Sequence, residues 1–527
     1  MSRIDWLAEY LTGLEEAGAT VRLDGGPATP ALRLEVSPPD WGKAAETAAG
    51  LGWRWAGVWG EALAQTCRVH ACLAGHAGHL LLETEVPFAD PELASHTPHY
   101  PAADRMERHA QDLLGLRFSG HPDPRRWTRH RAWPAEFHPL RGPALAGGGK
   151  PGRTPADSGY PFRPIQGPGV YEIPVGPVHA GIIEPGHFRF QAVGEDVLRL
   201  EQRLGYVHKG IEQLAVGRAP AELARLASRV SGDSTVAHTW AACQAMERAA
   251  GCAVPPRALH LRALLAERER VANHLGDIGA ICNDVGFAFA HLQCARLRER
   301  WQRRSGELFG HRLLMDTVIP GGVARDLPAG AGGALRAEHQ AMREAAAPVF
   351  AVIEDHPPLE DRLLGTGCLS REDARALGCT GYVAKASGLD FDLRRDSPYA
   401  PYDRLAVEVP LGTAGDVFNR VRVRMREVDI SLEIMDRLLA TLPGGAVSTE
   451  LPRPPAGAVG LGLVEGWRGE TLSFVRFDEL GQVARYFPRD PSWFLWPALE
   501  RLLPGNIVPD FPVCNKSVNA SYSGHDL

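Results

Sequence analysis

The sequence of 527 residues predicts an α+β protein with a small α+β N-terminal unit and a large, mainly helical unit that contains small β elements. A chain of this length exceeds what one ordinary hydrophobic core holds, so we expect more than one domain. Residues 142–168 are rich in Gly, Pro and Ala and lack hydrophobic periodicity, as is typical of a linker. Long helical patterns dominate after it. We therefore predict folded units at residues 1–141 and 169–527, joined by this linker.

The N-terminal unit combines short apolar runs with helical patterns. The run Leu80–Val86 predicts a strand, and the pattern from Trp41 to Leu51 predicts a helix. The unit ends in a polar string from Glu107 to Arg126, which contains a Gly-His-Pro-Asp turn followed by two arginines. Such a string can form a solvated salt-bridge surface, but the turn and the arginine pair favour a docking edge for another polypeptide.

The large unit contains two long helical patterns and several strand-like runs. Pro256 opens the first helix, and a second helix runs over about residues 415–442. Residues 471–475 and 483–487 predict the arms of a hairpin, and residues 405–411 predict a further strand. The apolar positions on the core face of the first helix are Leu261, Leu264, Leu265, Val271, Leu275, Ile278 and Ile281.

The composition argues against several classes of protein. The formal net charge of −6 and the pI of 6.4 give no basic surplus, which argues against a nucleic-acid binder. The nine cysteines include no Cys-x-x-Cys pair and no regular disulfide spacing, which suits a reducing compartment. No signal peptide is recognisable, and no window approaches the roughly 20 apolar residues of a transmembrane helix. We therefore expect any membrane role to come through partner subunits.

Two segments far apart in the sequence outline a metal site that lacks most of its ligands. They read Arg229-Val-Ser-Gly-Asp-Ser-Thr-Val-Ala-His238 and Asp510-Phe-Pro-Val-Cys-Asn-Lys-Ser517. Both resemble the paired Cys-x-x-Cys segments of nickel-iron hydrogenase large subunits, whose four thiolates hold a bimetallic centre. Nickel and low-valent iron favour soft thiolates, and a serine hydroxyl is a hard donor, so we expect no metal at this site. The resemblance gives a degenerate frame of Ser231, Ser234, Cys514 and Ser517.

A third segment supports the same resemblance. Residues 176–189 read Gly-Pro-Val-His-Ala-Gly-Ile-Ile-Glu-Pro-Gly-His-Phe-Arg. This is similar to the opening of hydrogenase large subunits and of the complex I subunit that forms the floor of the quinone site. In the hydrogenases, the glutamate at the position of Glu184 is associated with proton exit. A buried carboxyl group beside histidines can relay protons near neutrality, and the alternative is a turn in which Glu184 makes only a local contact.

Asp233 distinguishes the first segment from both families. The tyrosine that binds the quinone head group in complex I falls on Gly232, and hydrogenases carry an apolar residue where Asp233 stands. An acid between two serines predicts a hydrated polar pocket, which suits water or a small polar ligand and does not suit a quinone ring. A solvent-filled remnant is the alternative. On the layout of the family, we predict a proton-handling pocket with coupled titrations, formed by Glu184, His187, Asp233 and His238.

The resemblance covers nearly the whole chain. The string Glu107–Arg126 looks like the signature that closes the small hydrophilic subunit of respiratory complex I. Formate-hydrogenlyase-type hydrogenases carry this unit fused in front of the large subunit, which is the arrangement here. Further matches follow in order up to Gly466-Trp-Arg-Gly-Glu470. We expect the N-terminal unit to dock onto an iron-sulfur arm and not to pack tightly against the helices of its own chain.

The resemblance implies a subunit of a membrane-associated, complex I-like oxidoreductase complex, related to NADH dehydrogenase and hydrogenase. Such a complex couples electron transfer to ion or proton translocation, here without a nickel-iron centre. The implied partners are a small iron-sulfur subunit, which would hold the clusters because this chain lacks the thiolates, and membrane ion-translocating subunits. The implied location is peripheral, on the cytoplasmic side of the cell membrane.

We expect no bound cofactor in this chain and no activity of the chain alone. Two alternatives stay open. One is a non-catalytic structural or coupling subunit that transmits a conformational change. The other is an oxidoreductase site for an unknown acceptor or a quinone.

Overall fold

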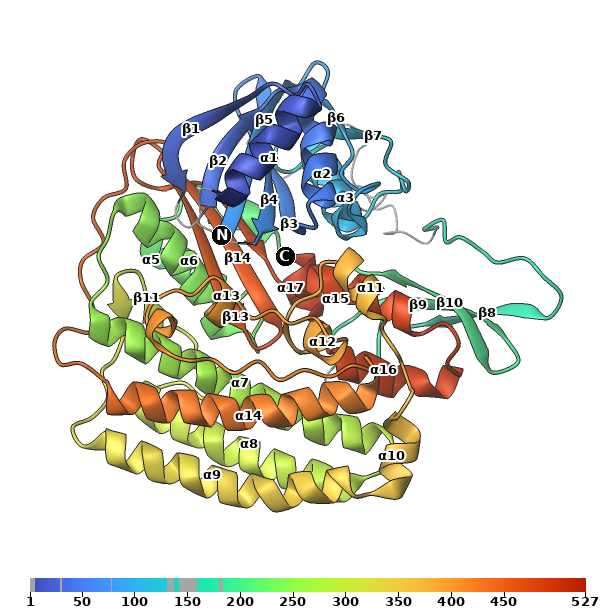
Figure 1. Ribbon diagram of the computed structural model, residues 1–527, viewed down its shortest axis with the longest axis vertical. Coiled ribbons are helices and arrows are strands. Elements are labelled where there is room, and N and C mark those ends of the chain that lie inside the picture. Colours follow the sequence, from blue (N-terminus) through green and yellow to red (C-terminus); the bar gives the residue numbers. More distant parts are fainter. Residues whose placement is uncertain (1–4, 29–30, 77, 130–136, 142–158, 180–182) are drawn as a thin grey trace.

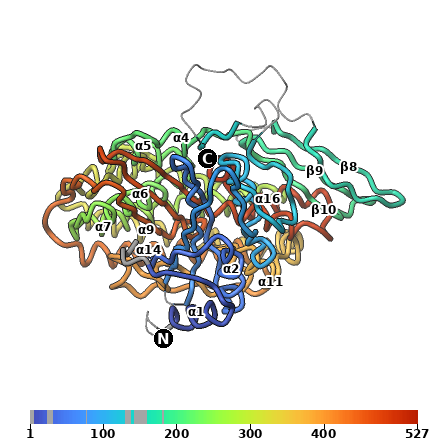
Figure 2. Tube along the Cα trace, turned by 90° about the horizontal axis from the view of Figure 1, so that it is seen from above, coloured from blue at the N-terminus to red at the C-terminus, as the bar shows by residue number. Residues whose placement is uncertain are grey.

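The structure is a computed structural model in which the N-terminal unit lies above a central sheet, and a layer of long helices lies below that sheet (Figure 1). A second small sheet projects from one side of the body, as the view from above also shows (Figure 2). The described residues are 5–28, 31–76, 78–129, 137–141, 159–179 and 183–527.

The N-terminal unit is built on a five-stranded sheet of order β1-β2-β5-β4-β3, in which β2 and β5 pair in parallel. The predicted strand Leu80–Val86 is confirmed as part of β5, and the predicted helix from Trp41 is confirmed as α2. The elements in chain order are α1 (Asp5–Glu16), β1 (Val21–Ala28), β2 (Ala31–Val36), η1 (Pro38–Asp40), α2 (Trp41–Gly50), β3 (Arg54–Ala62), β4 (Thr66–Gly75), β5 (Gly78–Pro87), β6 (Glu92–Ala94), η2 (Pro101–Ala103), α3 (Asp104–Leu114) and β7 (Arg117–Ser119).

The projecting sheet has the order β10-β9-β8 and is antiparallel throughout. The last part of the predicted linker packs beside it, because the side chain of Gln191 donates a hydrogen bond of 2.7 Å to the carbonyl of Arg163. Residues 142–158 of that linker lie outside the described residues. The strands are β8 (Val170–Val175), β9 (His187–Val193) and β10 (Asp196–Arg203).

Four long helices, α7, α8, α9 and α14, lie side by side below the central sheet (Figure 1). The predicted helices that begin at Pro256 and span about 415–442 are confirmed as α7 and α14. The helical part and its small strands comprise α4 (Ile211–Ala215), α5 (Pro220–Ala227), α6 (Thr235–Ala250), α7 (Pro256–Asp284), α8 (Ala288–Phe309), β11 (Val318–Ile319), β12 (Gly322–Val323), α9 (Ala331–Glu354), α10 (Pro357–Leu363), α11 (Arg371–Ala376), α12 (Gly381–Ala386), α13 (Leu393–Asp396), η3 (Tyr402–Arg404) and α14 (Val417–Ala440).

The strand predicted over residues 405–411 is wrong. In the described part of the chain this segment pairs with no other strand. It runs beside α14 instead, where the Arg437 guanidinium donates to the carbonyl of Ala406 at 3.1 Å and Arg426 pairs with Glu408 at 3.1 Å. Side chains of the helix therefore bind a segment that the apolar alternation assigned to a sheet.

The central sheet confirms the predicted hairpin as β14 and β15. Helix α6 lies directly against β13, because Gly460 and Gly462 have no Cβ atom. A Cβ at either position would lie 1.8 Å from a carbonyl oxygen of α6. The elements are β13 (Val459–Gly466), β14 (Gly469–Phe477), β15 (Val483–Arg489), α15 (Ser492–Leu502), η4 (Val508–Asp510), α16 (Phe511–Val518) and α17 (Tyr522–Asp526).

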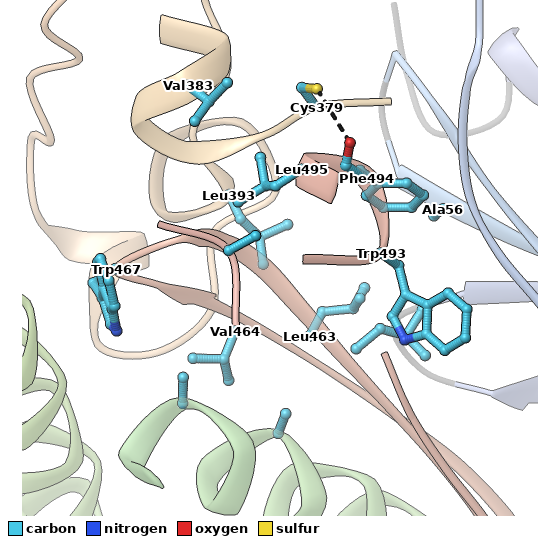
Figure 3. Close-up of a cluster of buried hydrophobic side chains, with 14 of the residues drawn as sticks. Ala56, Cys379, Val383, Leu393, Leu463, Val464, Trp467, Trp493, Phe494 and Leu495 are labelled. Atoms are coloured by element: carbon cyan, nitrogen blue, oxygen red, sulfur yellow. Dashed lines mark hydrogen bonds between the residues drawn. The ribbon is translucent and has the colours of Figure 1, made fainter. Parts of the chain in front are cut away.

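The two folded units share one hydrophobic core, so the expectation that the N-terminal unit does not pack tightly against the helices of its own chain is wrong. Figure 3 shows Ala56 of β3 beside Phe494 of α15 in a buried cluster that also contains residues of β13 and α12. The rings of Trp55 and Phe494 pack edge to face with their centroids 6.3 Å apart.

Glu470 also ties the two units together. This carboxylate is fully buried and contacts Arg54 at 2.5 Å and His79 at 3.1 Å from the N-terminal unit, and Arg489 at 2.5 Å from β15. Burial opposes its ionisation, but Arg54, His79 and Arg489 together hold the pKa of Glu470 well below its usual range. A buried ion cluster of this kind fixes the relative position of the units.

Candidate functional site

The first half of the expected frame lies where the chain enters α6. The hydroxyl of Ser231 donates to the Asp233 carboxylate at 2.8 Å, and that of Ser234 lies 3.4 Å from the same oxygen. Asn273 of α7 donates to the carbonyl of Asp233 at 2.7 Å, and the Trp467 indole donates to the same carbonyl at 2.8 Å. The backbone and side chain of Asp233 are therefore held from three sides.

The side chain of Arg468 lies against Asp233 and Ser234. Its guanidinium donates two hydrogen bonds of 2.6 Å to the two carboxylate oxygens of Asp233 and a third of 3.0 Å to Ser234. It also stacks over the Trp467 ring at 4.0 Å. Burial opposes ionisation of Asp233, but Arg468 outweighs it and lowers the pKa of Asp233. Asp233 is thus the ionised partner of a buried arginine and not a free acid.

The second half of the frame is formed by Ser521 and Gly524. The hydroxyl oxygens of Ser231 and Ser521 lie 2.8 Å apart. Ser521 caps α17 by accepting a hydrogen bond of 2.9 Å from the Gly524 amide. The spacing from Ser521 to Gly524 equals that from Ser231 to Ser234, so the structure brings together two segments of the same pattern.

Cys514 and Ser517 belong to a different cluster, so the expected second half of the frame is corrected. The Ser517 hydroxyl donates to the carbonyl of Cys514 at 2.7 Å and accepts from the Arg420 guanidinium at 2.9 Å. Burial raises the pKa of the Cys514 thiol to about 12. The sequence favoured this pair because it retains a cysteine. The Ser-x-x-Gly spacing at 521–524 was the available signal, but neither residue type indicates a metal ligand.

The four residues of the predicted proton-handling pocket do not bond to one another in the described part of the chain. The Glu184 carboxylate is exposed and accepts a hydrogen bond of 3.0 Å from the Ser523 amide. His187 lies on β9, where its Nδ1 is 3.2 Å from the carbonyl of Gly176.

His238 has a partner that sequence analysis missed. Its Nε2 lies 2.7 Å from the Asp490 carboxylate, and both side chains are fully buried. Burial opposes ionisation of Asp490, but His238 and Arg468 hold the pKa of Asp490 below its usual range. The α17 segment lies among these groups, since a Cβ at Gly524 would be 2.7 Å from Asp490. The space is therefore occupied by packed, hydrogen-bonded side chains and not by an open acidic pocket.

The residues of the corrected frame do not fit a nickel-iron centre. Positions 231, 234 and 521 offer hydroxyls, and position 524 offers no side chain. The charge of Arg468 is already balanced by Asp233. In the ranges described, no group of three or more His, Cys, Asp or Glu side chains has a geometry suited to a metal ion. Hard, neutral donors cannot replace four thiolates around soft metals.

A second buried network lies below the frame, between α7, α12 and α14. His274 Nε2 contacts Glu427 at 2.6 Å, as expected of a satisfied core histidine, and Lys385 contacts Glu427 at 2.7 Å. Lys385 also pairs with Asp392 at 2.6 Å. These groups are all fully buried, so the network ties α7 to α12 and α14.

The chain matches three protein families. Residues 284–456 match the respiratory-chain NADH dehydrogenase 49 Kd subunit, residues 50–145 match the 30 Kd subunit, and residues 209–276 match nickel-dependent hydrogenase. None of the helices described has the length and apolar character needed to cross a membrane.

Several curated proteins are similar over most of the chain. Formate hydrogenlyase subunit 5 of Escherichia coli K12 is 34% identical over 85% of this chain and 79% of its own length. Hydrogenase-4 component G of the same organism is 35% identical over 82% and 76%. The C/D subunit of the NADH-quinone oxidoreductase of Bacteroides fragilis is 30% identical over 72% and 75%. A solved chain from the membrane-bound sulfane sulfur reductase, an archaeal respiratory membrane complex, is 27% identical with a TM-score of 0.64, covering 68% of this chain and 98% of that one.

Proposed function

Because the chain belongs to the family of large subunits shared by formate-hydrogenlyase-type hydrogenases and the C/D subunits of NADH-quinone oxidoreductases, we propose that it is a peripheral subunit of a membrane-associated, complex I-like oxidoreductase complex. The proposed complex couples electron transfer to ion translocation without a nickel-iron centre in this subunit. The observation that supports the lack of a nickel-iron centre is the Asp233–Arg468 ion pair, which lies beside the hydroxyl groups of Ser231, Ser234 and Ser521.

The proposed partners follow from the same relationship. A small iron-sulfur subunit would supply the clusters, and membrane subunits would move the ions, with this chain on the cytoplasmic side. The nine cysteines contain no Cys-x-x-Cys pair, and seven of them are buried, which supports placing the clusters in a partner. The chain would act as an assembled subunit and not alone.

The frame residues would serve as fixed charges and hydrogen-bonding groups in this role. Asp233 and Arg468 form a charge-balanced ion pair at the N-terminal end of α6, and His238 and Asp490 form a second pair beside it. Glu184 and His187, which are not in ion pairs with these groups, would exchange protons at the edge of the frame. Proton movement there would accompany changes in the charge of an iron-sulfur cluster in the neighbouring partner subunit.

A non-catalytic coupling subunit is the second candidate, and the packed frame favours it over an oxidoreductase site for a quinone. The cavity that reaches Asp233 has a volume of about 20 Å³, which is room for one water and not for an aromatic head group. In this alternative, the ion pairs would hold the helices in the arrangement that transmits movement to membrane partners.

The test is ion transport by membrane vesicles that contain the complex. Cells that lack this chain should lose electron-driven ion transport, and the wild-type chain should restore it. Glu184→Gln should reduce transport or flatten its pH dependence if the edge of the frame handles protons. Normal transport in vesicles that lack the chain would contradict the proposal. Normal transport by Glu184→Gln across about pH 6 to 8 would favour the coupling subunit.

A further inference from the structure

A loop from His311 to Thr317, here called the cover loop, closes over the segment that carries Asp233. Arg229 binds Asp316 of this loop through two hydrogen bonds of 2.6 and 2.8 Å. Leu314 and Asp316 both have a φ of 60°, in the left-handed region that side-chain-bearing residues seldom adopt. Such a conformation persists only where its surroundings impose it, and it occurs often at functional sites.

A cavity of about 20 Å³ lies beneath the cover loop. Its lining includes Leu314 of the loop, Glu269 and Asn273 of α7, Ser305 of α8 and Asp233. Arg312 lies at its outer end, where the side chain is 54% exposed and donates to Gln302 at 2.9 Å. The volume and the polar lining meet the requirements of a bound water molecule. The lining of the cavity therefore extends from Arg312, which is exposed at the surface, to Glu269 and Asp233.

Glu269 differs from Glu267 on the same helix and from Glu427 on α14. Its carboxylate accepts hydrogen bonds of 2.7 and 3.2 Å from the amides of Val236 and Ala237, in the first turn of α6. No ion pair to it occurs among the described residues, whereas Glu267 and Glu427 each contact a cationic side chain within 3.1 Å. Glu269 is thus a buried carboxyl group that accepts from two amides, lies beside a water-sized cavity and has no counterion among the described residues.

The charges around Glu269 come from each element that packs against it. Asp233, with its partner Arg468, lies before α6; Arg268 and Arg270 lie on α7 itself; and Arg312 lies on the cover loop. Burial raises the pKa of Glu269 to about 8, the negative charge of Asp233 adds to this, and the two amides and Arg270 oppose it. The resulting pKa lies within the range in which a group can exchange protons with water near neutrality.

We propose that Glu269 is a proton-exchange site of this subunit, supplied by water in the cavity beneath the cover loop. A hydronium ion in the cavity gives its proton to the Glu269 carboxylate, which leaves a carboxylic acid and a water molecule, and the reverse step releases the proton. The coupling of this step to electron transfer rests on the proposed function. The titration itself does not, because it needs only the folded chain.

The first experiment is an infrared pH titration of the purified full chain over about pH 6 to 9. The difference between wild type and Glu269→Gln should show one carboxylic acid band that loses intensity as the pH rises and that is absent from the variant. Glu307→Gln, which removes an exposed carboxylate of α8, should retain the band. Identical titrations of wild type and Glu269→Gln would overturn the proposal.

The second experiment tests the water route through the rate at which this band shifts in heavy water. Ala272→Leu fills the cavity and should slow the shift by about tenfold or more. Ala295→Leu adds the same volume at an exposed position of α8 and should leave the rate unchanged. If Ala272→Leu does not fold, Arg312→Gln, which removes the side chain at the outer end, should change the rate instead. A rate that responds to none of the folded cavity variants would contradict the route.

The two proposals can fail separately. A titrating Glu269 in a complex that shows no coupled transport would overturn the proposed function and leave the proton-exchange site intact. Coupled transport with no titration of Glu269 would overturn the proton-exchange site and leave the proposed function intact.

Discussion

Arg468 and Asp233 form a bidentate ion pair, with both nitrogen–oxygen distances 2.6 Å, directly before the first turn of α6. The arginine side chain is 3% exposed, and the aspartate side chain is 35% exposed. The arginine therefore depends on this carboxylate for charge balance, while water still reaches the carboxylate. This pair accounts for the role of Asp233, which the neighbouring serines alone do not explain.

Asp233→Asn should destabilise the protein, because it leaves the Arg468 charge buried without its counterion. Breaking a fully buried pair costs about 3 to 5 kcal/mol, and the partial exposure of Asp233 lowers our expectation to about 2 kcal/mol. The double variant Asp233→Asn, Arg468→Gln should recover most of the loss. The midpoint of thermal unfolding measures both the loss of stability in Asp233→Asn and its recovery in the double variant. Equal midpoints for wild type and Asp233→Asn would show that the pair contributes nothing.

The corrected frame predicts a specific cross-link. With Ser231 and Ser521 hydroxyls 2.8 Å apart, the double variant Ser231→Cys, Ser521→Cys should form a disulfide under mild oxidation. Peptide mapping by mass spectrometry should find these two residues linked. Ser231→Cys alone serves as the control and should not link to the native Cys514. A link from residue 231 to Cys514 would restore the frame first expected from the sequence.

Glu470→Gln should loosen the N-terminal unit from the rest of the chain. The substitution removes the charge that Arg54 and Arg489 share in a fully buried site, so we expect a loss of about 3 to 5 kcal/mol. Limited proteolysis should release the N-terminal unit sooner than in the wild type. Glu479→Gln, at an exposed position in the turn after β14, is the matched control. Equal digestion of Glu470→Gln and wild type would argue against this cluster as the tie between the units.

Glu212 should give the protein an acid-dependent stability. Burial opposes its ionisation, but Arg485 and His109 outweigh it and lower the pKa of Glu212 from 4.5 to about 2. A carboxyl group with a depressed folded-state pKa adds stability above pH 4.5 and loses it as the pH falls towards 2. Glu212→Gln should therefore be less stable at neutral pH and should lose less further stability on acidification.

Unfolding midpoints, measured at a series of pH values from neutral to acid, give the pH dependence of stability for the wild type and for Glu212→Gln. Glu9→Gln, at an exposed position of α1, should keep the wild-type slope. Parallel curves for wild type and Glu212→Gln would contradict the expected linkage.

The long helices and the hairpin could be predicted because their signals are local. Helix α7 follows from Pro256 and a repeating apolar face, and β14 and β15 follow from two runs around a turn. The packing of the N-terminal unit could not be predicted, because Glu470 meets Arg54 and His79 across more than 390 positions of sequence. The string around Arg126 carried no information about the face that β3 presents, and its role as a docking edge stays a prediction.

The candidate site was predicted in part. Ser231, Ser234 and Asp233 do lie together, since one short segment carries them. Their partners Arg468, Ser521 and Asp490 come from three other elements, and none of these residue types alone marks a site. Glu269 was missed because its position on the core face of α7 gives no sign of the cavity beside it.

The nickel content of a transport-active complex shows whether this subunit works without a nickel-iron centre. The complex would be purified from cells grown with added nickel, assayed for electron-driven ion transport in vesicles, and analysed for metals in the same preparation. We expect ion transport together with iron from the partner clusters and no stoichiometric nickel, because hydroxyls and the Asp233–Arg468 pair occupy the frame. One nickel per chain in the active complex would contradict this expectation.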